Sequence, residues 1–177
     1  MATPNEFDII VFGASGYTGR LVAEYLQSQY GDGADGGLTW AMCGRNLEKL
    51  KTTRDELGLS PTVPVLEADA NDLSSLREIA SKCKVVLTTV GPYQQYGSGL
   101  LAACAEVGTD YVDLCGEPLW MQRMIKEYEE VAAKSGARIV FSCGFDSVPF
   151  DLGVYFLQLH ALSQYSEPFS RVRGRVR

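Results

Sequence analysis

Three glycines, Gly13, Gly16 and Gly19, recur at every third residue between a short apolar run and a helical pattern. Strand, glycine turn and helix in this order form the arrangement that binds the phosphates of a dinucleotide, although any tight turn also favours glycine. Gly13 permits the turn, Gly16 lets the backbone approach a pyrophosphate, and Gly19 lets the helix pack closely on the strand. The N–H groups at the start of the helix would face the phosphates. The predicted cofactor contacts of this turn are Gly13, Ser15, Gly16, Tyr17, Thr18 and Gly19.

The residues after the second predicted strand distinguish between two cofactors. An NAD site commonly has Asp or Glu there, which accepts a hydrogen bond from the ribose 2′-hydroxyl. This sequence has Arg45 and Asn46 at that place and no carboxylate before Glu48. A guanidinium suits a 2′-phosphate and also stacks on adenine, whereas the alternative is a solvated surface arginine. We therefore predict NADP(H) as the cofactor, with Arg45 and Asn46 among its contacts.

The turns after the third and fourth predicted strands supply further candidates. Asp69 and Ala70 come where the adenine edge usually lies, although Asp69 also suits an ordinary turn. The sequence Val90-Gly91-Pro92-Tyr93 follows the fourth strand. Ligands of such sheets bind outside the carboxyl ends of the strands, where the strand order reverses. We expect Val90, Gly91, Pro92 and Tyr93 beside the nicotinamide ribose, with Tyr93 reaching into the cleft; the alternative is a proline turn with a packed tyrosine.

Acid–base chemistry has few candidates in this chain. Tyr93 and Asp146 are the predicted catalytic residues, which would orient a substrate or relay a proton. Glu117 and Asp146 could be acids, bases or helix caps, and capping is common for an Asp-Ser pair before a helix. The lone histidine, His160, lies in an apolar helical segment and suits a core or domain contact. The sequence contains no Gly-x-Ser-x-Gly elbow and no clustered metal ligands, so we predict neither a serine hydrolase triad nor a metal site.

The elements that would position these residues alternate along the chain. Each crossover helix makes the next strand run the same way, and right-handed crossovers favour the doubly wound order 3-2-1-4-5-6. The sequence therefore predicts an α/β fold, a Rossmann-type NAD(P)-binding domain with about six parallel strands. Expected strands cover residues 9–12, 38–43, 63–68, 85–90, 111–114 and 139–142; expected helices cover residues 17–30, 47–57, 73–82, 98–106, 119–134 and 150–160.

Composition restricts the class of protein. The 177 residues are 46% hydrophobic and 21% charged, as in a globular domain, and the formal net charge of −6 argues against nucleic-acid binding. Five scattered cysteines without a Cys-x-x-Cys pair indicate reduced, buried thiols. We expect no signal peptide and no transmembrane segment, because no uncharged apolar run reaches the length that spans a bilayer. These observations predict a cytoplasmic protein and are compatible with peripheral membrane association.

The end of the sequence departs from the pattern. Arginines alternate at Arg171, Arg173, Arg175 and Arg177, so they would share one face of a strand. A basic arm for nucleic acid is one interpretation, but the first strand of a further domain is the better one. We therefore predict a dinucleotide-binding domain over residues 1–160, followed over residues 161–177 by a linker and the first strand of a truncated second, substrate domain.

Taken together, the motifs resemble those of the saccharopine dehydrogenase-like oxidoreductases, and most closely the branch that includes trans-acting enoyl reductases. The resemblance covers about residues 7–160 and rests on the segments 13–19, 44–46, 90–93, 113–118 and 144–153. It implies an NADP(H)-linked oxidoreductase with a substrate domain after the cofactor domain. The enoyl reductase branch works on lipid-like acyl substrates, so saccharopine itself is not the expected substrate.

Two functional hypotheses follow. The first is a reductase that transfers hydride between NADPH and an enoyl, imine or carbonyl substrate, a small molecule with an acyl or lipid-like character. The second is a non-catalytic NADP(H)-binding module that senses redox state or engages a partner protein. A homo-oligomer is compatible with both.

Overall fold

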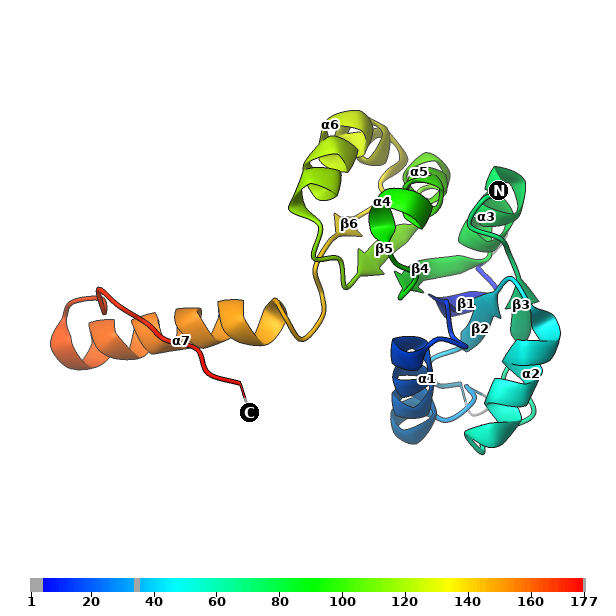
Figure 1. Ribbon diagram of the computed structural model, residues 1–177, viewed down its shortest axis with the longest axis horizontal. Helices are drawn as coiled ribbons and strands as arrows, with labels where there is room; N and C mark the ends of the chain where they lie inside the picture. The colour runs from blue at the N-terminus through cyan, green and yellow to red at the C-terminus, as the bar shows by residue number, and fades with distance from the viewer. Residues whose placement is uncertain (1–4, 34–35, 177) are drawn as a thin grey trace.

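The computed structural model describes residues 5–33 and 36–176 as a sheet flanked by helices, with one helix projecting from it (Figure 1). Residues 1–4, 34–35 and 177 lie outside this description, and with them the first residues of the predicted 1–160 domain and the last of the alternating arginines. The strands are β1 (Phe7–Phe12), β2 (Trp40–Gly44), β3 (Val65–Glu67), β4 (Cys83–Thr88), β5 (Asp110–Asp113) and β6 (Ile139–Val140). The helices are α1 (Tyr17–Tyr30), α2 (Leu47–Glu56), α3 (Leu73–Ser81), α4 (Tyr93–Tyr96), α5 (Ser98–Val107), α6 (Pro118–Ser135) and α7 (Val148–Tyr165).

The six strands form one parallel sheet in the order β3-β2-β1-β4-β5-β6. This confirms the predicted fold class and strand order. Strand β1 lies in the middle, where Ile10 pairs with Ala41 of β2 and with Val86 of β4. All three side chains are fully buried, as expected for central strands covered on both faces.

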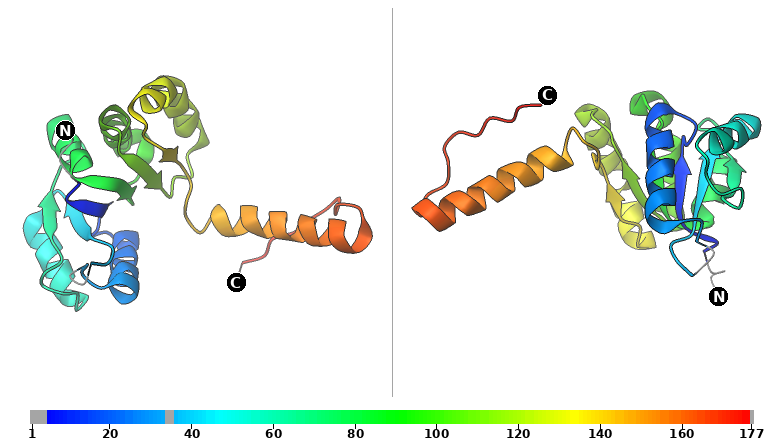
Figure 2. Two further views of the ribbon diagram at one scale, coloured as in Figure 1. Left: turned by 180° about the vertical axis from the view of Figure 1, so that it is seen from behind. Right: turned by 90° about the horizontal axis from the view of Figure 1, so that it is seen from below.

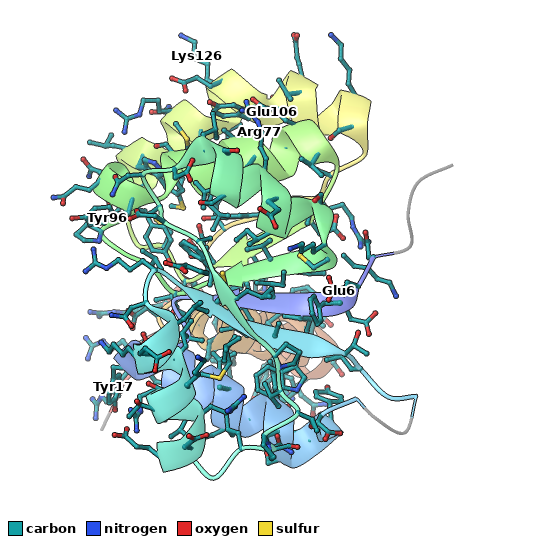
Figure 3. All side chains as sticks on the ribbon, turned by 90° about the vertical axis from the view of Figure 1, so that its right-hand side faces the viewer. Glu6, Tyr17, Arg77, Tyr96, Glu106 and Lys126 are labelled. Carbon is teal, nitrogen blue, oxygen red and sulfur yellow. The ribbon has the colours of Figure 1, made fainter. Side chains whose placement is uncertain are left out.

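Alternate residues of β1 face two separate apolar layers. Ile10 and Phe12 belong to the cluster under α3, α5 and α6, whereas Val11 belongs to the cluster under α1 and α2. Figure 3 shows these two helical layers on either side of the sheet, with Arg77 of α3 beside Glu106 of α5 in the upper layer. Their ion pair, 2.7 Å between Nη2 and Oε2, joins the two helices at the surface.

The same view shows which edge of the sheet carries the candidate residues. Tyr17, at the start of α1, and Tyr96, at the end of α4, lie at one edge of the sheet but on opposite layers (Figure 3). Glu6, which leads into β1, lies at the other edge. The edge with Tyr17 and Tyr96 is therefore the one where the carboxyl ends of the strands meet, and a ligand is expected there.

The buried Asp113 shortens the last strand. Strand β6 ends at Val140, two residues before the predicted end, and Ser142 has a φ of 59°. Asp113 Oδ1 accepts a hydrogen bond from the Ser142 N–H (2.8 Å), and the Asp113 carbonyl accepts one from the Cys143 N–H (2.7 Å). These bonds draw the chain out of the sheet register and into the loop that precedes α7.

The last helix and the tail differ most from the sequence analysis. Helix α7 continues to Tyr165, so the predicted domain boundary after residue 160 falls inside a helix. Residues 171–176 have no regular secondary structure in this chain and run back beside α7, so the first strand of a second domain stays a prediction (Figures 1 and 2). Within α7 only Ala161 is buried, and His160 is exposed, not part of a core.

Four of the five cysteines are buried. Cys43, Cys83, Cys104 and Cys115 are buried as predicted, and burial raises the pKa of Cys43 and of Cys83 to about 12. Cys143 is exposed, contrary to the prediction.

Among the described residues, none of the helices has the length and apolar character needed to cross a membrane.

Candidate cofactor-binding site

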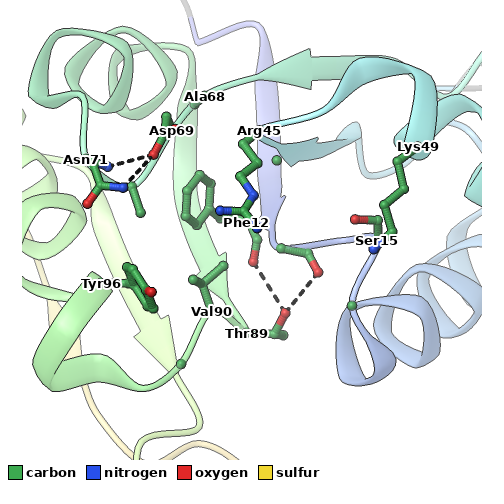
Figure 4. A pocket seen from close by; sticks show the side chains of 15 residues that line it. Phe12, Ser15, Arg45, Lys49, Ala68, Asp69, Asn71, Thr89, Val90 and Tyr96 are labelled. Carbon is green, nitrogen blue, oxygen red and sulfur yellow. Dashed lines mark hydrogen bonds between the residues drawn. The ribbon is translucent and has the colours of Figure 1, made fainter.

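A cleft of about 310 Å³ opens at the carboxyl edge of the sheet, beyond the ends of β1 and β4, where the strand order reverses (Figure 4). This is the place where doubly wound sheets bind ligands. The wall consists of the glycine turn and the ends of the four neighbouring strands. Its residues are Phe12, Gly13, Ser15, Gly16, Gly44, Arg45, Lys49, Ala68, Asp69, Ala70, Asn71, Thr89, Val90, Gly91 and Tyr96.

The glycine turn allows three close approaches of backbone. Gly13 has a φ of 89°, and a Cβ there would lie 2.6 Å from Val90 Cγ2 and 2.9 Å from Thr89 Oγ1. Thr89 Oγ1 donates to the carbonyls of Phe12 (3.4 Å) and Gly13 (3.3 Å), which holds the turn beside β4 (Figure 4). A Cβ on Gly19 would lie 2.2 Å from the Gly13 carbonyl oxygen. Only glycine permits this packing of α1 on the turn.

The start of α1 has the properties of an anion site. Its N-cap is Gly16, which brings no capping side chain, and its first turn contains no acidic residue. No acceptor among the described residues takes the N–H groups of Ser15 and Tyr17. A Cβ on Gly16 would meet only the Gly13 oxygen, at 3.2 Å, so the glycine leaves the approach to these groups open. A pyrophosphate therefore fits the turn chemically, because such a helix start favours negative charge.

Two cations line the cleft at the end of β2. Arg45 follows the strand directly, and Lys49 stands four residues later in the first turn of α2. Neither side chain has an ion-pair partner among the described residues. Asn46 does not line the cleft; its Oδ1 accepts a hydrogen bond from the Lys49 N–H (2.9 Å) and thereby caps α2. The cap fixes the helix start that presents Lys49, so Asn46 acts on the cleft indirectly.

The loop after β3 is held by its own hydrogen bonds. Asp69 Oδ1 accepts from the Asn71 N–H (2.9 Å) and from Asn71 Nδ2 (3.1 Å). Asp69, Ala70 and Asn71 all line the cleft, and Figure 4 shows Tyr96 on the same side as the Asp69–Asn71 pair. Asp69 therefore forms a turn and also lines the cleft, while its contact with the adenine edge stays a prediction.

Tyr93 does not reach into the cleft, contrary to the expectation. Its side chain is only 4% exposed, and its hydroxyl donates to the Thr88 carbonyl (3.2 Å) and accepts from the Leu114 N–H (3.3 Å). Burial raises the pKa of Tyr93, which disfavours the ionised form that a proton relay needs. The aromatic residue that lines the cleft is Tyr96, at the other end of the same short helix.

Two carboxylates act as anchors near the cleft. Glu117 accepts hydrogen bonds from the N–H groups of Tyr93 (2.7 Å) and Gln94 (3.0 Å), so it caps α4. Asp113 is 3% exposed and accepts from the Tyr111 hydroxyl (2.9 Å) and two backbone N–H groups. Burial raises the pKa of Asp113, although these hydrogen bonds oppose the shift. These contacts give both carboxylates a positioning role.

The other catalytic candidate, Asp146, lies outside the cleft. It is exposed in the loop before α7, where Ser147 is the N-cap but makes no side-chain capping bond. The structure does not bring Asp146 and Tyr93 together at one site. Among the described residues there is no cluster of His, Cys, Asp and Glu that could hold a metal ion.

The structure therefore divides the predicted cofactor residues into two groups. Those that line the cleft are Gly13, Ser15, Gly16, Arg45, Asp69, Ala70, Val90 and Gly91; those that do not are Tyr17, Thr18, Gly19, Asn46, Pro92 and Tyr93. Tyr17 is 83% exposed beside the turn. The other lining residues were not predicted from the sequence: Phe12, Gly44, Lys49, Ala68, Asn71, Thr89 and Tyr96. Asn46 is a recognisable N-cap, and it places Lys49 in the first turn of the helix that follows Arg45, which could have indicated Lys49.

Comparison with known protein families supports the cofactor. Residues 9–140 match the model of the saccharopine dehydrogenase NADP binding domain. The predicted NADP(H) cofactor and the predicted family resemblance are thereby confirmed.

Curated relatives point to one branch of enzymes. A Mycobacterium tuberculosis protein named for a proposed trans-acting enoyl reductase activity is 51% identical over 157 residues, which are 88% of this chain and 36% of the relative. The trans-acting enoyl reductase of Mycobacterium ulcerans is 44% identical over 157 residues, which are again 88% of this chain and 36% of the relative. The chain thus spans about a third of the length of the curated relatives it matches.

Solved structures with low sequence identity share the fold. Saccharopine dehydrogenase (L-Glu forming) from Saccharomyces cerevisiae superposes with a TM-score of 0.63 at 18% identity, over 89% of this chain and 30% of that one. An NADPH-dependent quinone oxidoreductase from Escherichia coli superposes with a TM-score of 0.51 at 21% identity, over 86% and 53% of the two chains. These similarities establish the Rossmann-type architecture.

Proposed function

Because the chain belongs to the saccharopine dehydrogenase NADP binding domain family, we propose that its cleft holds the NADPH of an enoyl reductase. The observation that carries this proposal is the pairing of an uncapped glycine turn with two unpaired cations in one cleft, as far as the described residues extend. The turn suits the pyrophosphate that all dinucleotides share. The cations suit the additional phosphate that distinguishes NADPH from NADH.

The cations favour NADPH because of their chemistry and their position. A guanidinium offers a planar fork of donors that matches a phosphate, and an ammonium adds a point charge. Arg45 and Lys49 would hold the 2′-phosphate, while Gly13, Ser15 and Gly16 would hold the pyrophosphate. A carboxylate after β2, as found in NAD sites, would repel the 2′-phosphate, and the sequence has none before Glu48.

The bound cofactor would supply a hydride, and the protein would supply position and electrostatics. We infer an enoyl substrate of acyl or lipid-like character in preference to an imine or carbonyl, since the relatives are named for enoyl reduction. A substrate domain after the cofactor domain, a cytoplasmic location and a homo-oligomer stay predictions. The rival function, a non-catalytic NADP(H)-binding module, shares the cleft but is not favoured by these relatives.

Binding to the chain itself tests the proposal. Isothermal titration calorimetry should show NADPH binding more tightly than NADH. Lys49→Ala should reduce the NADPH affinity, whereas Lys51→Ala on the same helix should not, because Lys51 points to Glu48 (2.8 Å) and does not line the cleft. Absence of NADPH binding, or equal affinity for the two cofactors, would contradict the proposal.

Turnover separates the two functions. A form as long as the relatives should consume NADPH stoichiometrically with an α,β-unsaturated acyl thioester and yield the saturated product. NADPH binding without consumption of any enoyl, imine or carbonyl substrate would favour the non-catalytic module.

A further inference from the structure

The last residue of helix α4, Tyr96, lines the cleft, but the helix is too short to be stable by itself. It has four residues, and a helix of this length forms too few internal hydrogen bonds to be stable alone. Its first turn is held instead by Glu117 from the loop after β5. Oε1 of this carboxylate accepts the Tyr93 N–H (2.7 Å), and Oε2 accepts the Gln94 N–H (3.0 Å). One side chain thus satisfies two backbone donors that the helix cannot satisfy internally.

The buried side of α4 is anchored in the core. The Tyr93 ring lies 5.5 Å from the Trp120 ring, and its hydroxyl bonds to the Thr88 carbonyl (3.2 Å). Gly97 follows the helix, and a Cβ there would lie 2.8 Å from Trp120. Side-chain packing and the Glu117 carboxylate therefore fix both the depth and the rotation of α4.

The outcome of this anchoring is the placement of Tyr96. Its side chain is 37% exposed and lines the cleft, and its hydroxyl has no hydrogen-bond partner in the described part of the chain. Figure 4 shows the ring at the end of the cleft near Asn71, with Val90 and Phe12 between it and Arg45. A flat apolar surface thus faces the loop that follows β3.

We propose that the adenine ring of NADP(H) stacks on Tyr96 and that Glu117 is the residue that positions this tyrosine. The inference rests on the proposed function. With the pyrophosphate at the glycine turn and the 2′-phosphate at Arg45, the adenosine half extends towards the ends of β2 and β3. Two aromatic residues line the cleft, Phe12 and Tyr96, and of these Tyr96 has the accessible ring, because it is 37% exposed whereas Phe12 is 2% exposed. Stacking of a base on an aromatic side chain is a strong and geometrically tolerant contact.

Loss of the ring tests the stacking. Tyr96→Ala should weaken NADPH and adenosine 2′,5′-bisphosphate by the same factor, roughly fivefold to a hundredfold, because both carry the adenine. Tyr96→Phe keeps the ring and should stay within about twofold of the wild type. In Tyr96→Trp, the bisphosphate, which has no nicotinamide, should by itself be sufficient to quench the fluorescence of the introduced tryptophan. Unchanged bisphosphate affinity in Tyr96→Ala would overturn the assignment, and a loss confined to NADPH would place the ring at the nicotinamide half.

A double-mutant cycle tests the positioning role of Glu117. Glu117→Gln should weaken the bisphosphate several-fold in the wild type but less than about twofold in the Tyr96→Ala background, because residues that act through one contact are not additive. Glu127→Gln, at an exposed position of α6, the helix that follows Glu117, is the control and should change nothing. If Glu117→Gln unfolds, Glu117→Asp replaces it in the cycle. Equal losses in both backgrounds would show that Glu117 supports only the fold, and would refute its part of the proposal.

Different results refute the proposed function and the adenine contact. A wild-type chain that binds neither NADPH nor the bisphosphate refutes the proposed function and this inference with it. A wild-type chain that binds both, with Tyr96→Ala binding equally well, refutes only the inference.

Discussion

The close packing of α1 on the glycine turn predicts that Gly19→Ala destabilises the fold much more than Gly16→Ala. A Cβ on Gly19 would lie 2.2 Å from the Gly13 carbonyl oxygen and 2.7 Å from Ala14 Cα. Ordinary contacts between such atoms are about 3.5 Å or longer. Both neighbours are backbone atoms, which cannot rotate away, so α1 and the turn must separate by roughly 1 Å.

The magnitude follows from two opposing terms. Overpacking costs about 1–3 kcal/mol, and a clash with backbone belongs at the upper end or above it. Alanine favours the helix by about 1 kcal/mol over glycine. We expect Gly19→Ala to lower the free energy of unfolding by about 2 kcal/mol or more, which lowers the Tm of a domain of this size by about 4–8 °C.

Gly16 provides the matched control. Its φ of −80° suits alanine, and its Cβ would lie 3.2 Å from the Gly13 oxygen, so a small shift relieves the contact. As an N-cap, alanine costs about 1 kcal/mol or less relative to glycine. We expect Gly16→Ala to stay folded and yet bind NADPH more weakly, because the methyl group lies where the pyrophosphate approaches.

Urea unfolding followed by circular dichroism measures the first effect, and calorimetric titration with NADPH measures the second. Equal stability of the two variants would refute the reasoning about the turn. Unaltered NADPH affinity in Gly16→Ala would refute the assignment of the phosphate loop, whatever the stabilities.

Charge, pH and the projecting helix each provide another test. Arg45→Ala should reduce the preference for NADPH over NADH by roughly tenfold to a hundredfold in calorimetric titrations, whereas the control Lys51→Ala should preserve it. An unchanged ratio of the two dissociation constants in Arg45→Ala contradicts the NADP assignment. The ammonium of Lys84, 2.6 Å away, is the main cause that lowers the pKa of Asp8 from its ordinary 3.8. The carboxylate therefore stabilises the fold above pH 3.8, and the stabilisation is lost as pH falls through the lower folded pKa. Asp8→Asn should reduce the acid decline of the free energy of unfolding, measured with urea, by up to about 1 kcal/mol, and an identical pH profile contradicts this. Deletion of residues 148–177 should change the Tm by less than about 3 °C and the NADPH affinity by less than about twofold, because α7 buries only Ala161 among its described residues. Loss of cooperative unfolding in the shortened chain would contradict this expectation.

The strand order and the place of the cleft could be predicted because they depend on chain order. Continuous apolar runs mark strands that are buried on both faces, and short crossovers leave few possible arrangements. Residues next to a strand end, such as Gly13, Arg45 and Val90, reach the carboxyl edge by that fact alone. Their place in the cleft can therefore be predicted without knowledge of side-chain packing.

The direction of Tyr93 and Tyr96 could not be predicted in the same way. Helix α4 has four residues, too few for a hydrophobic period. Its orientation depends on Glu117 and Trp120, which come from a loop and a helix more than twenty positions later in the sequence. Two tyrosines three residues apart are equivalent in sequence, and only tertiary packing buries one and exposes the other.

The tail shows the limit of a period-two pattern. Alternation indicates which side chains would share a face, but a strand also needs a neighbour for its backbone hydrogen bonds. Residues 171–176 have no such neighbour within the described chain, and the polar contacts near them come from Gln158, which bonds the N–H and the carbonyl of Phe169. The pattern therefore predicts a face without determining a structure.

In the proposed binding mode, the three parts of the cleft recognise different parts of one ligand, so the variants should differ in which ligands they weaken. Gly16 would face the pyrophosphate, so its substitution should weaken NADPH and NADH alike. Arg45 would face the 2′-phosphate, so its loss should weaken NADPH and leave NADH unchanged. Tyr96 would face the adenine, so its loss should weaken both cofactors and the bisphosphate. A variant that merely destabilises the fold would weaken all three ligands by one factor, and therefore the Arg45 result is the decisive one: selective loss of NADPH requires a contact with the group that NADH lacks.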